Sequence, residues 1–298
     1  MKIGKTALNL LNYFIRKDIK KRRKHYPPHS FKEWINIPYI DDGNPYHTYD
    51  VYLANEEIRK RVCIMYIHGG AYILGEHQDN YPFAYYLLNK GYDFVSTDYI
   101  PNDGNRSSLE LVKDVVNNVL HVLSRLKEYD LQDDKIVFAG DSAGGHFALL
   151  LAELFKNKEA AKELGFELPE LDIKAVILCC PVYNFKDMGK GIMSKAGLKR
   201  MLGPSYNDPE LLIKLTPRTY IDSFNLPIFV STCTHDFIRP ESLLINEDLK
   251  ERKNYTFFDL QCEDKKVDHV HNVVKTNLKE SIIVNDAIVD FIIKYTSK

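Results

Sequence analysis

Residues 135–155 read KIVFAGDSAGGHFALLLAELF, and this stretch decides the fold. Residues 135–139 are apolar enough for a buried strand, and residues 145–155 are rich in alanine and leucine, as helices are. Between them, Gly140-Asp141-Ser142-Ala143-Gly144 has the pattern G-x-S-x-G. Where a strand turns directly into a helix at this pattern, the serine backbone is strained, small flanking residues avoid clashes, and the hydroxyl rises above the carboxyl edge of the sheet. Ser142 is therefore the candidate nucleophile, and it requires a base.

The same alternation of strand and helix continues outward from this stretch. We expect further strands at residues 32–40, 46–53, 62–67, 92–99, 173–182, 226–233 and 256–262, and helices at 82–89, 107–126, 241–252 and 281–295. The helix at 107–126 opens with a capping box of Ser107 and Glu110. Strands alternating with crossover helices predict an α/β protein with a mostly parallel, doubly wound sheet. Residues 183–223 break the rhythm, and we interpret them as a lid inserted above the sheet, the alternative being a surface excursion with no gating role.

Composition bounds the class of protein. The chain has 298 residues, of which 45% are hydrophobic and 27% charged, values that are ordinary for a globular protein with one sizeable core. Forty basic and 41 acidic residues give a net charge of −1, so nothing attracts the chain as a whole to nucleic acid. No linker splits the chain, and we expect one α/β domain over residues 31–298 after a basic segment at 1–30.

The charge is concentrated at the N-terminus. Residues 1–24 hold nine Lys or Arg against Asp18, a local charge of +8. Two interpretations remain open: a solvated helix or arm lying over an acidic body, or a basic amphipathic segment in weak contact with a membrane surface. The stretch is a poor signal peptide, and no run of about 18 apolar residues predicts a membrane-spanning helix.

The cysteine pattern favours free thiols. Four of the five cysteines lie within or at the edges of apolar strands, Cys262 lies at the end of another, and no CxxC pair is present. Free thiols in a reducing compartment, and so a cytoplasmic location, explain this pattern better than disulfides or a zinc site, and we expect no metal.

Residues 62–67 end in His68-Gly69-Gly70-Ala71, which predicts a set of backbone donors. Glycines after a strand leave N–H groups uncovered, and acyl transfer needs such donors where negative charge develops on a carbonyl oxygen. We assign the N–H groups of Gly70, Ala71 and Ala143 to an oxyanion hole, with Gly69 as the fallback. His68 is interpreted as a loop-bracing residue.

The acid and base are expected downstream, after the last two strands, because the chain order in this kind of site is serine, acid, histidine. Asp236 follows the strand at 226–233, and His269 lies in the loop before the final helix. We choose Asp236 as the orienting acid and His269 as the base. Alternatives remain: Asp236 pairing with Arg239, and His271 as the base. His269-Val270-His271 also has the form of a metal-binding pair, but lacks a third ligand at suitable spacing. His235 is interpreted as a neighbour and Asp98 as a structural hydrogen-bonding group.

These motifs resemble the hormone-sensitive-lipase-like group of α/β-hydrolases from about residue 62 to the C-terminus. The matches are His68-Gly69-Gly70 to HGG, residues 140–145 to GDSAGG, Asp98-Tyr99 to DYR, residues 236–239 to DPLR, and residues 269–271 to the HGF or HVF that carries the histidine. The last match favours His269 over His271. The chain departs from the pattern at Ala71, Ile100, Phe237 and His271, and these differences bear on substrate range more than on chemistry.

The resemblance implies an esterase or lipase-like serine hydrolase that acts on small or medium acyl esters and uses no cofactor. Two alternatives remain: an amidase, formamidase or peptidase with the same residues, and a non-catalytic small-molecule-binding member of the fold. The expected partner is a small ester.

Overall fold

A computed structural model describes residues 31–132, 134–187 and 195–297. The basic segment at 1–30, and with it the predicted arm or membrane contact of residues 1–24, lies outside the described residues. So do residues 188–194 of the predicted lid. Among the described helices, none is both long and apolar enough to cross a bilayer.

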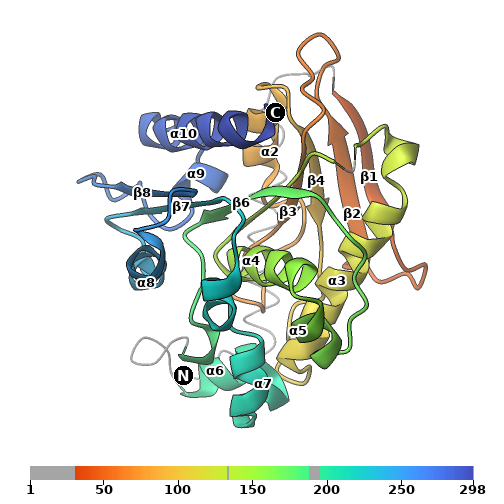
Figure 1. Ribbon diagram of the computed structural model, residues 1–298, viewed down its shortest axis with the longest axis vertical. Helices are drawn as coiled ribbons and strands as arrows, with labels where there is room; N and C mark the ends of the chain where they lie inside the picture. The colour runs from red at the N-terminus through yellow and green to blue at the C-terminus, as the bar shows by residue number, and fades with distance from the viewer. Residues whose placement is uncertain (1–30, 133, 188–194, 298) are drawn as a thin grey trace.

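Eight strands form one sheet in the order β1-β2-β4-β3-β5-β6-β7-β8 (Figure 1). Their bounds are β1 Lys32–Pro38, β2 Thr48–Leu53, β3 Cys63–Ile67, β4 Asp93–Thr97, β5 Ile136–Asp141, β6 Ile173–Cys179, β7 Ile228–Cys233 and β8 Tyr255–Leu260. β1 pairs with β2 and β2 with β4 in antiparallel fashion, and the remaining neighbours are parallel. The predicted doubly wound α/β sheet is confirmed, and the carboxyl ends of β5, β7 and β8 meet at one edge.

Helices cover both faces of the sheet. The principal helices are α2 Tyr81–Leu88, α3 Ser108–Ser124, α4 Ala143–Lys156, α5 Lys158–Glu163, α8 Arg239–Leu249, α9 His271–Val274 and α10 Lys279–Thr296. In Figure 1, α2, α9 and α10 lie above the sheet, and α3, α4 and α8 lie below it. Two cores result, one joining β-strand side chains to α3, α4 and α8, the other joining the opposite face to α2 and α10. The central strands β3 and β5 are buried at every position, as their continuous apolar runs predict.

Local signals explain several boundaries. The side chain of Ser107 accepts from the N–H of Glu110, and the Glu110 carboxylate accepts from the N–H of Ser107, so α3 begins with the predicted capping box. Strand β6 ends at Cys179 because Cys180 has φ 48° and turns the chain. The prediction of a strand to residue 182 is wrong for that reason.

The segment at 183–223 forms short helices: η2 Phe185–Asp187, α6 Lys195–Leu202, η3 Gly203–Asn207, α7 Pro209–Lys214, η4 Pro217–Thr219 and η5 Ile221–Ser223. Leu202, Leu212 and Leu215 are buried in the core that contains α3 and α4. The Ser205 hydroxyl accepts from the N–H of Ser108, and the Asn102 amide donates to Met201 O. The segment is thus anchored to the domain, and its gating role stays a prediction.

Candidate active site

Ser142 sits at the single residue between β5 and α4, with φ 51° and ψ −118°. For a residue with a side chain, positive φ is a strained conformation that the surroundings must impose. Here the Ser142 N–H donates to Cys179 O at 2.9 Å, and its carbonyl accepts from the N–H of Val182 at 3.0 Å. The turn is therefore fixed from the neighbouring strand β6.

Three glycines make that turn sterically feasible. A methyl group on Gly140 would overlap Gly144 O, and one on Gly144 would overlap the carbonyl oxygens of Ile67 and His68. One on Gly145 would lie 2.8 Å from Pro181 Cβ. The start of α4 thus packs against the end of β3 at backbone distance, which brings the serine next to the loop that follows β3.

His269 lies between Ser142 and Asp236 and contacts both of them. His269 Nε2 lies 3.0 Å from Ser142 Oγ, and His269 Nδ1 lies 2.6 Å from Asp236 Oδ1. Asp236 follows β7 and is 5% exposed, and Ser142 is 8% exposed. The structure therefore brings together three side chains from positions 142, 236 and 269 at the carboxyl edge of the sheet, with dimensions suited to proton transfer.

Asp236 is held as a carboxylate by its partners. Its Oδ2 accepts from Thr232 Oγ1 at 2.8 Å, and its Oδ1 accepts from Ile238 N at 3.0 Å as well as from His269. Burial raises the pKa of Asp236, but these hydrogen bonds, that of His269 foremost, outweigh burial and lower the pKa below its ordinary value. Thr232 carries no motif and could not be found from the sequence.

The rival assignments have other partners. Arg239 pairs with Asp259, its Nε 3.0 Å from Oδ1, and not with Asp236. His271 Nδ1 lies 2.8 Å from Ser281 Oγ, and burial lowers the His271 pKa to about 4. His235 Nε2 lies 3.3 Å from Glu263 O, outside the group around Ser142.

The loop after β3 carries the predicted donors. No described residue accepts a hydrogen bond from the backbone N–H of Gly70, Ala71 or Ala143. The N–H of Gly69, in contrast, donates to Asp141 Oδ1 at 3.0 Å, and the Tyr66 hydroxyl donates to the same oxygen at 2.8 Å. The fallback donor Gly69 is therefore engaged within the protein, which favours Gly70, Ala71 and Ala143 as the predicted donors. Asp141 lies in the G-x-S-x-G stretch, and its role in holding the loop was missed.

His68 and Asp98 have the bracing roles expected of them. His68 Nδ1 lies 2.6 Å from Gly69 O, its Nε2 lies 2.9 Å from Asp98 Oδ1, and its ring stacks on Tyr99 at 4.3 Å. Ala71 and Tyr72 both have positive φ, at 51° and 64°, so this loop is a sharply turned backbone.

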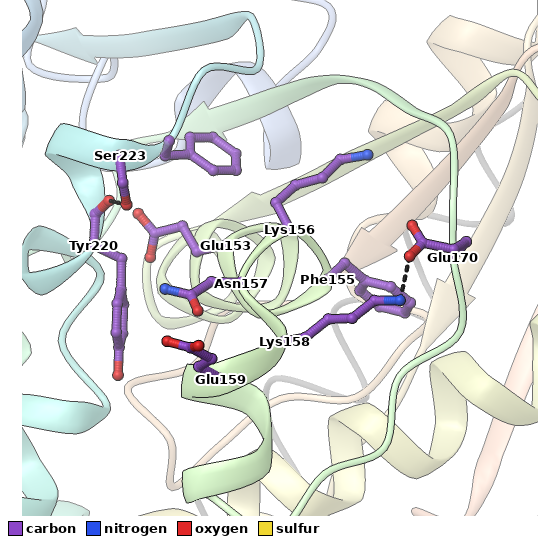
Figure 2. A pocket seen from close by; sticks show the side chains of 10 residues that line it. Glu153, Phe155, Lys156, Asn157, Lys158, Glu159, Glu170, Tyr220 and Ser223 are labelled. Carbon is purple, nitrogen blue, oxygen red and sulfur yellow. Dashed lines mark hydrogen bonds and ion pairs between the residues drawn. The ribbon is translucent and has the colours of Figure 1, made fainter.

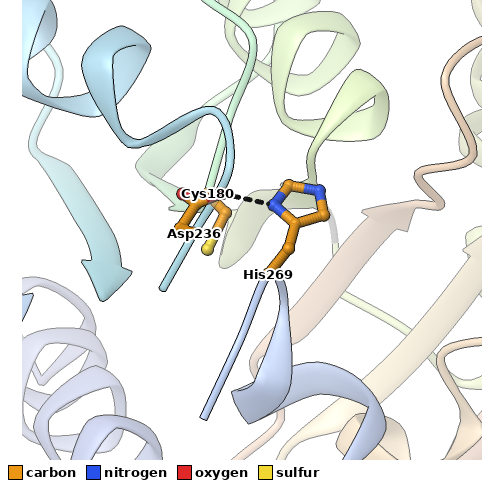
Figure 3. A group of neighbouring side chains, drawn as sticks. All are labelled: Cys180, Asp236 and His269. Carbon is orange, nitrogen blue, oxygen red and sulfur yellow. Dashed lines mark hydrogen bonds and ion pairs between the residues drawn. The ribbon is translucent and has the colours of Figure 1, made fainter. Parts of the chain in front are cut away.

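Cys180, Asp236 and His269 are the described group whose atoms lie close enough to share a metal ion (Figure 3). Figure 3 shows the hydrogen bond that already joins the carboxylate to the imidazole. Cys180 Sγ accepts from Val270 N at 3.4 Å, and burial raises the pKa of this thiol well above its usual value. A buried neutral thiol is a poor ligand, so the contacts favour proton transfer over metal binding.

A separate cavity of about 470 Å³ lies at the other end of α4, between α5 and residues 220–224 (Figure 2). Glu153 lines it and is 11 residues along α4 from position 142, about 16 Å along the helix axis. Burial raises the Glu153 pKa well above its usual value, and neither carboxyl oxygen has a hydrogen-bond partner in the described chain. This cavity lies apart from Ser142.

The fold and the strained serine between β5 and α4 define an α/β-hydrolase. The sequence pattern described as BD-FAE matches residues 49–246, and the chain belongs to that family. It is 26% identical over 176 residues to esterase LipQ of Mycobacterium tuberculosis (strain ATCC 25618 / H37Rv), covering 58% of this chain. It is 25% identical over 196 residues to the probable isoprenylcysteine alpha-carbonyl methylesterase ICMEL1 of Arabidopsis thaliana, covering 66%. The alignments span 41% of each of these relatives.

Among solved structures, esterase B of Lactobacillus rhamnosis (HN001) superposes with a TM-score of 0.85 at 20% identity, covering 98% of this chain and 95% of that one. The same enzyme inhibited by a tributyrin phosphonate gives a TM-score of 0.85 at 19% identity, with the same coverage. These likenesses extend the α/β-hydrolase fold over nearly the whole chain.

Proposed function

We propose that this protein hydrolyses carboxylic esters through a covalent acyl-enzyme on Ser142. The observation that carries the proposal is the continuous hydrogen-bonded path from Ser142 Oγ through His269 to Asp236. A serine hydroxyl becomes a nucleophile when an adjacent base takes its proton, and the base works when a third group fixes its orientation. The relatives named as esterases support the same class of substrate.

Acylation begins when His269 Nε2 accepts the Ser142 proton as Oγ attacks the ester carbonyl carbon. The N–H groups of Gly70, Ala71 and Ala143 donate to the oxygen that becomes negative. The carbon–oxygen bond to the alcohol then breaks, and the alcohol leaves with the proton from Nε2. Water attacks the acyl-enzyme by the same steps and releases the acid. Asp236 remains a carboxylate throughout and stabilises the imidazolium.

Substrate size follows from the relatives and remains part of the proposal. Esterase B is inhibited by a tributyrin phosphonate, whose name indicates four-carbon acyl groups. We therefore propose short or medium acyl esters as substrates here, and the segment at 183–223 as a lid over the site.

The test is labelling by a fluorophosphonate probe together with hydrolysis of a p-nitrophenyl ester series from two to twelve acyl carbons and of matching anilides. We expect labelling of the wild type, hydrolysis that is fastest for short or medium esters, and anilides cleaved far more slowly. Ser142→Ala should neither label nor hydrolyse. Ser242→Ala is the matched control, because Ser242 is a buried serine whose hydroxyl has no hydrogen-bond partner among the described residues.

Each negative outcome separates an alternative. Preference for the anilides would assign the site to amide hydrolysis. A wild type that neither labels nor turns over any substrate would refute catalysis at Ser142, as the alternative of a non-catalytic binding protein requires, and end the proposal. Membrane contact by residues 1–24 is tested by co-sedimentation with anionic vesicles of the full chain and of a variant lacking residues 1–24; equal sedimentation would end that part.

A further inference from the structure

Four buried side chains that the proposed mechanism does not use form a hydrogen-bonded network next to the loop of residues 68–71. Asp50 lies on β2, Asp98 follows β4, and His68 and His77 lie between β3 and α2. His77 Nε2 is 3.0 Å from Asp50 Oδ1, and its Nδ1 is 2.7 Å from Asp98 Oδ2. Asp98 Oδ1 is 2.9 Å from His68 Nε2. Each of the four is at most 4% exposed.

The partners determine where the protons lie. His68 bridges a carboxylate and the carbonyl oxygen of Gly69, and both accept only, so both ring nitrogens of His68 must carry a proton. His77 bridges two carboxylates in the same way. Burial lowers the pKa of His77, but the hydrogen bonds with Asp50 and Asp98 outweigh burial and raise it to about 10. Two carboxylates and two imidazolium groups therefore alternate, and their charges compensate inside the protein.

At the His68 end of this network, hydrogen bonds hold the peptide group between Gly69 and Gly70. Gly69 O accepts from His68 Nδ1 at 2.6 Å and from the Tyr99 hydroxyl at 3.1 Å. In a planar trans peptide, the carbonyl of one residue and the N–H of the next point in opposite directions. Fixing Gly69 O on the buried side therefore directs the N–H of Gly70 the opposite way within the same peptide plane, away from the buried His68 and Tyr99. That N–H is one of the three proposed oxyanion donors.

We propose that His77, clamped between Asp50 and Asp98, is a positioning residue that fixes the orientation of the Gly70 N–H through Asp98, His68 and Gly69 O. The proposal rests on the proposed ester hydrolysis at Ser142. His77 does not contact Ser142, and its effect on the Gly70 N–H passes through one hydrogen bond, from Nδ1 to Asp98 Oδ2. Without His77, Asp98 Oδ2 loses its imidazole donor, and Asp98 keeps only the contacts of Oδ1 with His68 and with the N–H of Tyr99. Asp50 loses its buried cation, so the Asp98–His68 pair loses its fixed geometry.

The experiment compares His77→Gln and Asp50→Asn with wild type in steady-state hydrolysis of p-nitrophenyl butyrate and in the rate of fluorophosphonate labelling. Glutamine is neutral and donates from one nitrogen only, so it cannot replace the two ring nitrogens of His77 that face Asp50 and Asp98. Asp50→Asn keeps the shape of the side chain while removing its charge. Arg59→Gln is the matched control, because Arg59 and Asp93 form a buried ion pair at 2.9 Å that does not belong to this hydrogen-bonded network. Melting temperature is measured for every variant.

We expect kcat of His77→Gln to fall about tenfold, part of the hundred- to thousandfold that loss of a whole donor costs. KM should stay within twofold of wild type, since the donor acts on the charge that develops in the transition state, and labelling should slow by the same factor as kcat. Asp50→Asn should show the same pattern with a smaller fall in kcat, about threefold. Arg59→Gln should have a lower melting temperature but an unchanged kcat.

Wild-type kcat and labelling rate in both network variants, with only a lower melting temperature, would overturn the positioning role and leave the proposed function intact. A rise in KM at constant kcat would overturn it equally. If His77→Gln does not fold, Asp50→Asn decides alone. A wild type inactive on every ester and unlabelled would refute the proposed function and this inference with it.

Discussion

Replacing Asp236 with asparagine tests the geometry of the site more sharply than removing the side chain does. In Asp236, the oxygen that faces His269 Nδ1 also accepts from the N–H of Ile238, at 2.6 Å and 3.0 Å. The other oxygen accepts from Thr232 Oγ1 at 2.8 Å, and a hydroxyl group can either donate or accept. Asparagine at 236 is therefore expected to keep its oxygen toward His269 and Ile238 and to place its NH₂ toward Thr232.

The magnitude follows from that orientation. A wrongly oriented asparagine would present a donor to Nδ1, force the other tautomer, and cost on the order of 10⁴-fold in kcat. With the oxygen kept in place, the variant loses only the negative charge opposite the imidazolium. A hydrogen bond to a charged group is worth about 1.5–3 kcal/mol, which corresponds to roughly 10- to 150-fold in rate. We therefore expect Asp236→Asn to fall in that smaller range.

The assay is steady-state hydrolysis of p-nitrophenyl butyrate by Asp236→Asn and Asp236→Ala, with Thr232→Val as the companion variant. Asp236→Ala should lose far more than Asp236→Asn, since nothing then holds Nδ1–H. Adding Thr232→Val to Asp236→Asn removes the acceptor for the NH₂ group and should reduce kcat further. An Asp236→Asn variant as impaired as Asp236→Ala would refute the reasoning about which oxygen faces which donor.

Four further expectations concern other residues. Ser142→Ala should lower kcat about a million-fold if the three groups act as a unit, and residual activity near wild type in a pure preparation would contradict the assignment. His271→Asn should keep kcat within about threefold, measured on the same ester, because His271 contacts Ser281 and not Ser142. Phe237 is 64% exposed and its ring lies 4.4 Å from that of His269, so Phe237→Ala should reduce kcat/KM for aryl acetates about tenfold while leaving methyl acetate within twofold; equal losses would count against it. Above pH 4.5, the free energy of unfolding of Glu153→Gln relative to the wild type should rise by about 1.4 kcal/mol per pH unit, up to the raised pKa of folded Glu153. The reason is that Glu153 of the wild type stays protonated in the folded state but ionises in the unfolded state. Denaturant titrations at pH 5, 6 and 7 that give the same difference between variant and wild type would contradict this.

Much of the fold follows from local signals in the sequence. The continuous apolar runs of β3 and β5 and the capping box at Ser107 each predict an element that the structure contains. Errors are confined mainly to ends, as at β6, and to short helices such as α5 and α9 that have too few residues for a periodic pattern. Turns such as the one at Cys180 depend on contacts from other strands, which no local pattern encodes.

The candidate site divides in the same way. A motif carries Ser142, and chain order points to Asp236 and to the pair His269 and His271. The motif match favours His269 within that pair, and the backbone supplies the physical reason: Val270 has φ 53°, so the chain turns left-handed between the two histidines, and His271 begins α9 facing Ser281. His77 carries no signal, because its partners depend on how β2 and β4 are paired, with Asp50 opposite Ser96.

The position of Cys180 affects how inhibition experiments on this protein should be interpreted. Its sulfur accepts from the N–H of Val270, the residue after His269, and its buried thiol resists ionisation. Iodoacetamide and similar alkylating reagents need a thiolate, so they should act on the native protein slowly. Once attached, however, an alkyl group on the Cys180 sulfur would displace the loop that carries His269 and abolish turnover. Inactivation by a thiol reagent would then imitate a cysteine-dependent enzyme, although the proposed nucleophile is the hydroxyl of Ser142. The time course of that inactivation would report how often the interior of the protein opens.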